Sequence, residues 1–355
     1  MKTKDKTRPL LMGLPLAELS NLLNQNGKRP YVADQIFDWV YKKDLLCPLK
    51  WANIAKDVRE WVETNFRLDL PSVSWKGVSR DGTQKFLLEM KDAQTVEAVV
   101  IAAPHRLTLC LSTQVGCAMG CTFCHTATQG LTRHLEAGEI VGQFIAVQRE
   151  LSAQDDSARL THIVYMGMGE PLHNFEAVKK ATGLFLEAKG LGLGQRRITL
   201  STSGLVPQIE KLSDFPPINI AISLHGARDD IRSKLMPIGR RYDLQRLFKA
   251  VRTIPLKAHR HITYEYLLIK ELNDGRKDIE ALADLLPRKS SKVNLIPFNE
   301  YPGTPFRRPS RERIAWFQDE LCRKGLTCTI RRTKGDDILA ACGQLKTSVR
   351  RPHSQ

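Results

Sequence analysis

The apolar positions in the first part of the chain recur at helical spacing. In LPLAELSNLLNQNG and RPYVADQIFDWVYKKD they return every three or four positions, which predicts helices across residues 14–66. From Ser72 to about Ala103 the period changes to two, with an Asp-Gly turn between two strand-like runs and VEAVVIA as a third. The pattern therefore predicts a helical N-terminal domain over residues 1–70 and an antiparallel β extension over residues 71–104.

The rest of the chain alternates between strand-like and helical patterns. The predicted strands are Leu107–Ser112, Thr161–Met166, Arg197–Ser201, Asn219–Leu224, His261–Leu268 and Lys292–Ile296. The predicted helices are Glu136–Leu151, Phe175–Ala188, Val206–Leu212, Leu244–Ile254, Lys277–Leu286 and Arg311–Lys324. Such β–α units predict a parallel sheet over residues 105–345, either an incomplete (β/α)6 barrel or an open doubly wound sheet. One more strand, Thr327–Arg332, and a helical stretch GDDILAACGQL are expected next, before a basic tail over residues 346–355.

Composition and charge narrow the class of protein. The 355 residues include 54 Lys and Arg against 38 Asp and Glu, a net charge of +16. Such an excess predicts contact with a polyanion, most simply nucleic acid, although a basic surface can also serve solubility alone. There is no apolar run of about 18 residues that would span a membrane. Pro9, Gly13 and Pro15 interrupt the short apolar stretch near the start, so we expect a cytoplasmic protein without an export signal.

Three of the eight cysteines are gathered in CAMGCTFC, as Cys117, Cys121 and Cys124. Eight cysteines are too few for a disulfide scaffold of this length, so the group favours ligation or catalysis in a reducing compartment. Structural zinc is the plain alternative, but it takes four protein ligands, and no second CxxC or HxxxH completes the set. Three thiolates would leave one iron of a [4Fe-4S] cluster open. The amino and carboxylate groups of S-adenosylmethionine (SAM) can chelate that iron, and an electron can then break the S–C5′ bond.

Glycines and polar residues follow several predicted strands, at the ends where parallel α/β folds gather their ligands. In YMGMGEP, Gly167 and Gly169 allow close approach to the backbone, and the Glu170 carboxylate can accept from a methionyl ammonium. The motifs STSG, SLHG and PFN close three further strands. Each alone is more often a cap or a turn. Together they predict a SAM site made of Gly169, Glu170, Ser201, Ser223, Leu224, His225 and Asn299.

The combined motifs resemble those of one known family. CLSTQVGCAMGCTFC, MGMGEPLHN, RRITLSTSG, AISLHGARDDIRSKLMPI, NLIPFN and GDDILAACGQL are similar to motifs of the RlmN/Cfr family of radical SAM RNA methyltransferases, from about Arg29 to Leu345. The resemblance implies an incomplete (β/α)6 radical SAM barrel with one [4Fe-4S] cluster on Cys117, Cys121 and Cys124. The RlmN branch, which this chain resembles more, methylates carbon 2 of an adenosine in the peptidyl-transferase region of 23S rRNA and beside the anticodon of certain tRNAs. The Cfr branch methylates carbon 8.

The resemblance also assigns roles to residues outside the cysteine group. It implies that Cys342 becomes S-methylated, that Cys110 is its resolving partner and that Glu97 is the proton acceptor. Carbon 2 of adenine is electron-poor and does not attack the methyl group of SAM. The implied route therefore uses two SAM molecules, an S-methylcysteine and a covalent RNA–protein intermediate. The other three cysteines match no such position and are interpreted as small side chains without a role, namely Cys47, Cys322 and Cys328.

RNA contact is expected at the N-terminal domain, where basic and aromatic residues alternate. The candidates are Lys28, Arg29, Lys42 and Lys43, with the aromatic residues Tyr31, Phe37, Trp39 and Tyr41. Most of these aromatic residues lie at helical spacing and are better explained as core, which leaves the basic residues as the contacts. The target adenine has to leave its stack to reach a barrel. The implied partners are 23S rRNA, tRNA and an external electron donor of the flavodoxin or ferredoxin type, without a membrane, and we expect a monomer.

Three alternatives stay open at this point. Methylation at carbon 8 would use the same residues. A methylthiotransferase would need a second cysteine-bearing domain for an auxiliary cluster, and the sequence shows none. A basic RNA-binding protein with a structural or redox-sensing cluster would share the charge and the cysteines but not the chemistry. One residue departs from the family pattern, His125, which stands where a small hydroxyl residue is expected after the third cysteine.

Overall fold

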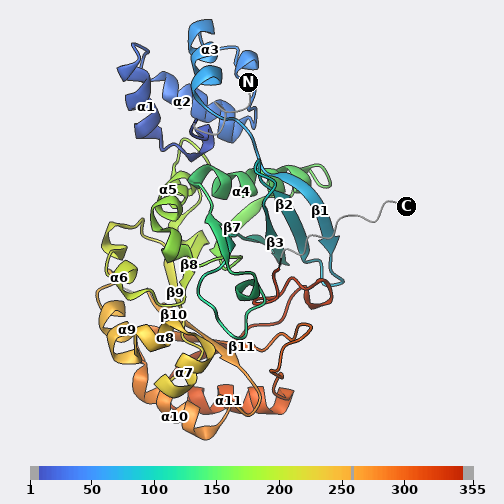
Figure 1. Cartoon of the computed structure of the whole chain (residues 1–355), viewed down its shortest axis with the longest axis vertical. Coiled ribbons are helices and arrows are strands. Elements are labelled where there is room, and N and C mark those ends of the chain that lie inside the picture. The colour runs from blue at the N-terminus through green and yellow to red at the C-terminus, as the bar shows by residue number, and fades with distance from the viewer. Residues whose placement is uncertain (1–7, 257–259, 347–355) are drawn as a thin grey trace.

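The computed structural model describes residues 8–256 and 260–346, so the predicted basic tail from residue 347 onward lies outside the described residues. The first part of the chain is helical, as the periodicity predicted, and forms a separate lobe at the top of Figure 1. Its elements are η1 (Leu11–Gly13), α1 (Leu16–Gln25), α2 (Val32–Phe37), the π-helix η2 (Asp38–Lys42), η3 (Pro48–Lys50) and α3 (Lys56–Asn65).

Ten strands form one sheet in the order β1-β2-β3-β4-β7-β8-β9-β10-β11-β12. The first four strands are antiparallel neighbours, and those from β4 to β12 are parallel. The antiparallel strands are β1 (Ser72–Val78), β2 (Gln84–Glu89) and β3 (Thr95–Ala103). The parallel strands are β4 (Arg106–Cys110), β7 (Leu160–Tyr165), β8 (Ile198–Thr202), β9 (Asn219–Ser223), β10 (Ile262–Leu268), β11 (Ser291–Pro297) and β12 (Thr327–Ile330).

The strand order decides between the two predicted architectures. A doubly wound sheet reverses its order at a switch point, whereas here the parallel strands follow one another in chain order from β4 to β12. The end strands β1 and β12 do not pair. The barrel is therefore incomplete, and a seam remains between these two edges. The predicted incomplete barrel, with its helical N-terminal region and antiparallel extension, is thus confirmed.

Helices follow the parallel strands and lie outside the barrel (Figure 1). They are α4 (Ala137–Ser152), α5 (Phe175–Leu186), α6 (Val206–Ile209), α7 (Asp229–Leu235), α8 (Ile238–Arg241), α9 (Leu244–Val251), α10 (Arg276–Leu285) and α11 (Arg311–Arg323). The sequence did not predict α7 and α8. In α7 only Ile231 and Leu235 provide the helical apolar spacing, which is too short a pattern to identify. No helix within the described residues is long and apolar enough to cross a membrane.

Two local predictions were wrong. The first barrel strand ends at Cys110 rather than at Ser112, and a separate two-stranded hairpin follows, β5 (Gln114–Gly116) and β6 (Leu131–His134). The stretch GDDILAACGQL is not a helix apart from one 3-10 turn, η8 (Asp336–Ile338). Positive φ angles at Gly335, Leu339 and Gly343 prevent a continuous helix in this segment.

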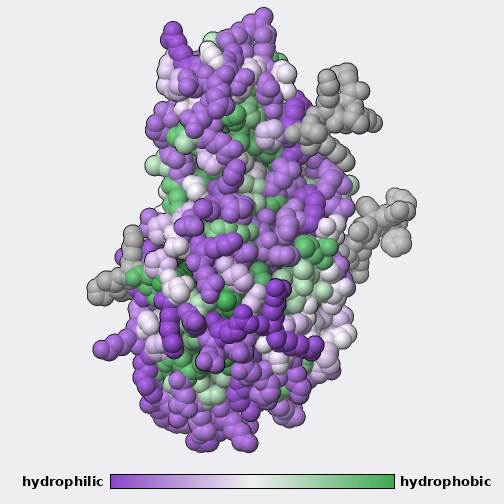
Figure 2. Space-filling model, turned by 60° about the vertical axis from the view of Figure 1, so that its left-hand side comes forward, coloured by the Kyte–Doolittle hydropathy of each residue, from purple (hydrophilic) through white to green (hydrophobic). Residues whose placement is uncertain are grey.

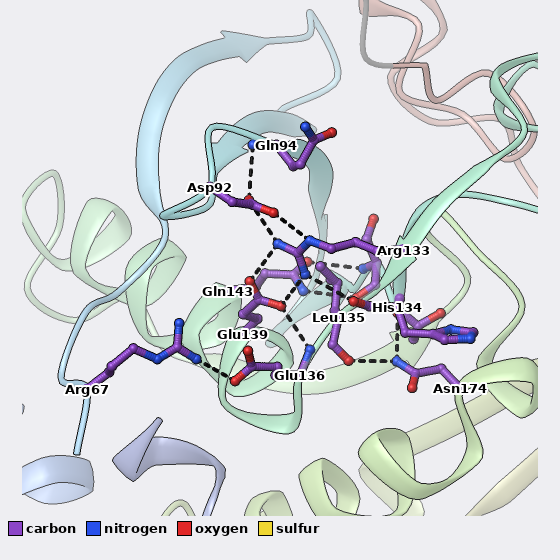
Figure 3. A network of polar contacts seen from close by, with 12 residues as sticks. Arg67, Asp92, Gln94, Arg133, His134, Leu135, Glu136, Glu139, Gln143 and Asn174 are labelled. Atoms are coloured by element: carbon purple, nitrogen blue, oxygen red, sulfur yellow. Dashed lines mark hydrogen bonds and ion pairs between the residues drawn. The ribbon is translucent and has the colours of Figure 1, made fainter. Parts of the chain in front are cut away.

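Charged side chains fasten the hairpin to the rest of the protein (Figure 3). Arg133 of β6 donates to the Asp92 carboxylate in the β2–β3 turn at 2.7 and 3.0 Å. It also donates to both carboxylate oxygens of Glu139, in the first turn of α4, at 2.8 Å. Close by, Arg67 donates to Glu136 at 2.6 Å and links the end of the helical lobe to the start of α4. The two bidentate contacts of Arg133 fix the orientation of the hairpin as well as its distance from these carboxylates.

The helical lobe also docks on the barrel through the outer helices. Its apolar residues belong to the same continuous core as those of the barrel. Exposed ion pairs surround this contact, for example Glu18 with Lys180 at 3.0 Å and Asp34 with Lys189 at 2.7 Å. Because exposed pairs contribute only about 0–1 kcal/mol each, the shared apolar core is the main force that holds the lobe in place.

We predict that Arg133→Ala destabilises the fold by about 2–4 kcal/mol, because it leaves the nearly buried Glu139 carboxylate without its cation. Thermal melting of the purified protein measures the effect. The matched control is Lys180→Ala, which breaks an exposed ion pair and should lower the stability by less than about 1 kcal/mol. Equal melting temperatures for the two variants would contradict the role of Arg133 as a structural clamp.

Candidate functional site

The three grouped cysteines lie in the loop that the β5–β6 hairpin encloses. The backbone N–H of Cys117 donates to the Gly130 carbonyl at 2.8 Å, which closes the base of the loop. At Gly116 φ is 77°, and an added Cβ would lie 1.9 Å from the Gly130 oxygen, so only glycine fits there. The loop therefore has a fixed base from which its thiols project into a cavity of about 160 Å³.

Burial opposes ionisation of these thiols. It raises the pKa of Cys117 to about 12, and burial together with the neighbouring thiols raises the pKa of Cys121 and Cys124. Thiolates at this position therefore need a bound cation to exist at neutral pH. In one zinc site the sulfurs would lie about 3.8 Å apart. Within residues 8–256 and 260–346, no group of three or more Cys, His, Asp or Glu side chains is arranged to hold a single metal ion.

A buried arginine indicates that the cysteine site holds an anionic group. Arg232 is fully buried, and its guanidinium donates to the backbone carbonyls of Ser203 at 2.7 Å and Tyr242 at 3.5 Å. Within the described residues no carboxylate forms a hydrogen bond or close ion pair with it, and its Nε has no hydrogen bond. Burial lowers the pKa of Arg232 to about 10, and the negative charges of Cys121 and Asp229 oppose that shift. A cluster bound by three thiolates is negatively charged and would balance this cation, so the residues fit a [4Fe-4S] cluster.

Residues at the carboxyl ends of β7, β8 and β9 line the same small cavity. They are Gly169, Glu170, Ser201, Ser223 and His225. At Gly169 φ is 101° and a Cβ would lie 2.6 Å from that of Gln114, so the turn requires glycine. The Glu170 carboxylate accepts from the N–H groups of Leu172 at 3.0 Å and Ser203 at 2.7 Å. A carboxylate oxygen can accept more than one hydrogen bond, so a ligand ammonium could also donate to Glu170.

His225 enters this cavity as a neutral imidazole. Its Nδ1 accepts from the Leu267 N–H at 3.1 Å, so the remaining proton is on Nε2. Burial lowers the pKa of His225 to about 3, and the charge of Arg232 acts in the same direction. The ring also meets Phe123 edge-on at 4.9 Å. His225 can therefore donate a hydrogen bond from Nε2 without carrying a charge.

Two residues predicted for the SAM site, Leu224 and Asn299, do not line the small cavity. Leu224 is fully buried in the core, and its N–H donates to the Glu265 carbonyl at 3.0 Å. Asn299 lines a second cavity of about 560 Å³, and its side-chain amide donates to the Cys342 carbonyl at 3.3 Å. Neither side chain is among those that line the small cavity. Asn299 instead holds the backbone of the segment that carries Cys342.

Cys342 lies where the two cavities meet. It lines the small cavity beside the three cysteines and also the large cavity inside the barrel. The irregular segment that carries it crosses the seam of the barrel, since Ser79 donates to Asp337 at 2.5 Å and Lys85 to the Leu339 carbonyl at 3.2 Å. A sulfur atom here can face a molecule in either cavity.

Cys110 and Arg331 share the large cavity with Cys342. Cys110 ends β4 and is buried, which raises its pKa to about 12; the charge of Cys342 adds to this shift and that of Arg331 opposes it. The pKa of Arg331 is raised most by Cys342, with smaller contributions from Glu265 and Cys110. The side chain of Arg331 makes one hydrogen bond within the described residues, to the Met166 sulfur. The sequence drew attention to neither Arg331 nor Arg232, because a single arginine carries no motif.

Glu97 is buried on β3, outside the residues that line either cavity. Its carboxylate lies 3.2 Å from the Lys85 ammonium and accepts from the N–H of Lys346 at 3.1 Å. Burial raises the pKa of Glu97, and Lys85 opposes that shift. The next inward position on the same face of β3 is Val99, which pairs with Cys110. Glu97 is therefore close to the cysteine pair along the sheet but is tied to a lysine.

His125 connects the cysteine loop to the Cys342 segment. Its backbone N–H donates to the Gly343 carbonyl at 2.7 Å. Its ring stacks on that of Tyr301, with the ring centres 4.7 Å apart and an angle of 12° between the ring planes. The next residue, Thr126, donates to the Leu345 carbonyl at 2.5 Å. A small hydroxyl residue at position 125 could not form this stack. His125 therefore packs on Tyr301 at the position where the family pattern has a small hydroxyl residue.

The predicted RNA contacts of the helical lobe are mostly engaged within the protein. Lys28 pairs with Asp57 at 2.6 Å, and Lys43 pairs with Asp38 at 3.1 Å. Of the four aromatic candidates only Tyr31 is exposed, at 54%. The others pack in or against the core, as helical spacing suggested: Phe37, Trp39 and Tyr41. Figure 2 shows one face of the whole molecule as mainly hydrophilic, with hydrophobic residues in smaller patches.

Comparisons with known proteins agree with this architecture. Residues 111–286 match the radical SAM superfamily, and residues 10–67 match the ribosomal RNA large subunit methyltransferase N-terminal domain. The dual-specificity RNA methyltransferase RlmN of Magnetococcus marinus is 42% identical over 340 residues, covering 96% of this chain and 95% of the relative. That of Syntrophobacter fumaroxidans is 43% identical over 330 residues, covering 93% and 96%.

A solved structure matches both lobes. The radical SAM methyltransferase of Sphaerobacter thermophilus superposes with a TM-score of 0.88 and 42% sequence identity, covering 95% of this chain and 99% of that one. Both the helical lobe and the barrel are therefore shared with these proteins. Near-complete coverage at this identity shows that the chain belongs to the RlmN family of radical SAM RNA methyltransferases.

Proposed function

We propose that the protein methylates carbon 2 of an adenosine in 23S rRNA and in tRNA, through an S-methyl group on Cys342. The position of Cys342 carries this proposal, because its segment lines both the cavity beside the three cysteines and the large cavity inside the barrel. A sulfur at that junction can receive a methyl group on one side and present it to a base on the other.

The chain's own residues would hold the cofactor and the cosubstrate in the small cavity. Cys117, Cys121 and Cys124 would ligate a [4Fe-4S] cluster, which supplies the electron for reductive cleavage of SAM. Glu170 would accept a hydrogen bond from the SAM ammonium, and the neutral His225 would donate from Nε2. Ser201 and Ser223, whose hydroxyls lie 3.3 Å apart, would contact the ribose and carboxylate.

The first chemical step would belong to Cys342. Its thiolate attacks the methyl carbon of SAM, which forms the S–CH3 bond and releases S-adenosylhomocysteine. The guanidinium of Arg331 lies close enough to interact with this sulfur and would stabilise its negative charge. A hydrogen atom would then pass from the methyl group on Cys342 to the 5′-deoxyadenosyl part of a second, cleaved SAM. The remaining methylene carbon would bond to carbon 2 of the adenine and join the protein to the RNA.

Release of the RNA would need a proton acceptor and a second thiol. Glu97 would take the proton from carbon 2 of the adduct, and the unpaired electron would pass to an external one-electron carrier. The Cys110 sulfur would then attack the Cys342 sulfur and break its bond to the methylene carbon, which takes up a proton to become the methyl group and leaves a Cys110–Cys342 disulfide. The buried Cys110, with its raised pKa, stays protonated until it attacks. An external donor of the flavodoxin or ferredoxin type would reduce the cluster, and outside reductant would reopen the disulfide.

The remaining features of the proposal concern the whole protein. We propose that residues 1–70 act as an accessory domain that touches RNA away from the target base, through lysines and arginines outside its ion pairs, such as Lys42. Residues 105–345 would form the radical SAM core, with residues 71–104 as an extension that anchors the Cys342 segment. We further propose a cytoplasmic protein that works as a monomer.

Nucleoside mass spectrometry tests the position of methylation. RNA treated with the reconstituted protein, SAM and a reductant should contain 2-methyladenosine, because carbon 2 is the position expected of this branch of the family. The matched control is Cys342→Ala, which should form none. Detection of 8-methyladenosine instead would assign the protein to carbon-8 chemistry and overturn the proposed position.

The cysteine pair makes a second prediction. Cys110→Ala should accumulate a covalent RNA–protein adduct, because nothing then attacks the Cys342 sulfur. Denaturing gel electrophoresis with labelled RNA measures the adduct. Cys342→Ala should form no adduct and no product, and Cys328→Ala, a buried cysteine that lines neither cavity, should turn over like the parent. Normal turnover by Cys110→Ala would remove its resolving role.

The Lys85–Glu97 pair makes a prediction about pH. Glu97 must be ionised to accept a proton, so the rate of adduct resolution should fall as the pH falls through its pKa. Lys85→Met removes the cation that lowers this pKa, so the pKa rises further and the acid limb should shift to higher pH. Lys85→Arg keeps the charge and should leave the limb near that of the parent. Identical profiles for Lys85→Met and the parent would exclude Glu97 as the acceptor.

A further inference from the structure

The loop that carries the three cysteines reaches the surface of the protein. Between Cys117 and Phe123 every second residue is exposed, namely Ala118, Gly120 and Thr122. All three of these side chains are small, so they add little bulk between the solvent and the thiols. A large molecule that has to come near the cysteine site can therefore approach it closely on this side.

The turn between α7 and α8 is in direct contact with the exposed loop. The backbone N–H of Thr122 donates to the Leu235 carbonyl at 2.9 Å. A Cβ added at Gly120 would lie 3.6 Å from the ring of Pro237, which is ordinary van der Waals contact. Met236, between these two residues of the turn, lines the small cavity together with the cysteines. The turn thus touches the cysteine loop on the outside of the protein and the cysteine cavity on the inside.

Four exposed cations lie on either side of this turn and form what we call the basic patch: Lys234, Arg240, Arg241 and Arg246. Arg241 and Arg246 both lie over the ring of Tyr242, at 5.4 and 5.2 Å from its centre. None of the four cations forms an ion pair with an acid in residues 8–256 and 260–346. Their positive charge is therefore available to a partner.

The acids of the same stretch do not neutralise the basic patch. Asp229 and Asp243 accept backbone N–H groups in the first turn of α9, each at 2.8 Å. Asp230 lies 3.9 Å from Arg228, which is not part of the patch. A group of cations that keeps its charge attracts a negatively charged partner and increases the rate at which that partner arrives.

The position of the basic patch favours a protein over RNA as this partner. The four cations line neither the small cavity nor the large one, so a base held in the barrel would not contact them. They adjoin the cysteine loop instead, where the proposed chemistry needs an electron. A protein that carries a one-electron group and an acidic surface has the chemistry that fits both the charge and the place.

We propose that the basic patch and the exposed cysteine loop together form the docking surface for the protein that reduces the cluster. This inference rests on the proposed function and adds to it the site and the charge of the electron donor. In one encounter the reduced flavin or iron–sulfur group of the donor loses one electron, and the oxidised cluster gains it. No bond forms between the two proteins. Interfaces for electron transfer are small and short-lived, so a few charges determine how often they form.

The test compares two double variants of the full-length, reconstituted protein with SAM and without RNA. Lys234→Gln/Arg240→Gln removes the two cations that flank residues 235–237, the turn that touches the cysteine loop. The control, Lys249→Gln/Lys289→Gln, removes two exposed cations toward the amino ends of the barrel strands, where neither residue lines a cavity. The probe is a flavodoxin in its fully reduced form, and its one-electron oxidation to the semiquinone is followed by anaerobic stopped-flow absorbance. Photoreduced deazaflavin, a small reductant, is used in parallel, and 5′-deoxyadenosine is measured by chromatography.

The patch variant should react with reduced flavodoxin about tenfold more slowly than the parent at low salt, because it attracts the acidic donor less. The difference should disappear at about 1 M salt, where charges are screened beyond roughly 3 Å. With deazaflavin the patch variant should form 5′-deoxyadenosine at the rate of the parent, and the control should match the parent in both assays.

Three results would contradict the inference or what it rests on. An unchanged rate with flavodoxin, or an equal loss in the control variant, would overturn the docking surface and leave the methylation chemistry standing. A patch variant that loses affinity for tRNA but keeps its rate with flavodoxin would assign the surface to RNA instead. Failure of the parent to form 5′-deoxyadenosine with deazaflavin would overturn the proposed function itself.

Discussion

The buried site of three thiols is the constraint around which the rest of the structure is arranged. Cys117, Cys121 and Cys124 project into one small cavity where burial and their mutual repulsion oppose ionisation. Three thiolates at this position need bound metal ions to be stable, and a [4Fe-4S] cluster held by them would carry a net negative charge that faces the buried Arg232. The hairpin, the Arg133 clamp and the carboxyl-end turns all hold the walls of this cavity in position.

The segment that carries Cys342 is held in position differently from the cysteine loop. It forms local turns, with hydrogen bonds such as Ala340 to Gly335 and Gln344 to Ala341, but positive φ angles at Gly335, Leu339 and Gly343 prevent a continuous helix. Other parts of the chain supply further partners. These are Ser79 and Lys85 of the extension, His125 and Thr126 of the cysteine loop, and Asn299 after β11. The Cys342 sulfur is thus positioned largely by tertiary contacts, and a change in any of those elements would shift its position.

The sequence predicted well what depends on periodicity and spacing. The helical lobe, the antiparallel extension and the parallel strands follow from apolar patterns, and the cysteine spacing with the strand-end motifs identified one end of the barrel. It predicted poorly what depends on long-range contacts. Nothing local indicates that Asn299 bonds to the Cys342 backbone, that the Nε of Arg232 is buried without a hydrogen bond, or that His125 stacks on Tyr301. The residues 335–345 have a helical composition, and only their distant partners explain their irregular path.

The route of the Cys342 segment across the seam has a consequence for the order of assembly. This segment follows every barrel strand in the chain, so synthesis from the N-terminus produces the curved sheet and the cysteine loop first. Its backbone carbonyls then cap the loop through His125 and Thr126. Until it docks, the backbone N–H of His125 and the hydroxyl of Thr126 lack these partners. The cysteine loop therefore reaches its final form only after the last part of the described chain has been synthesised.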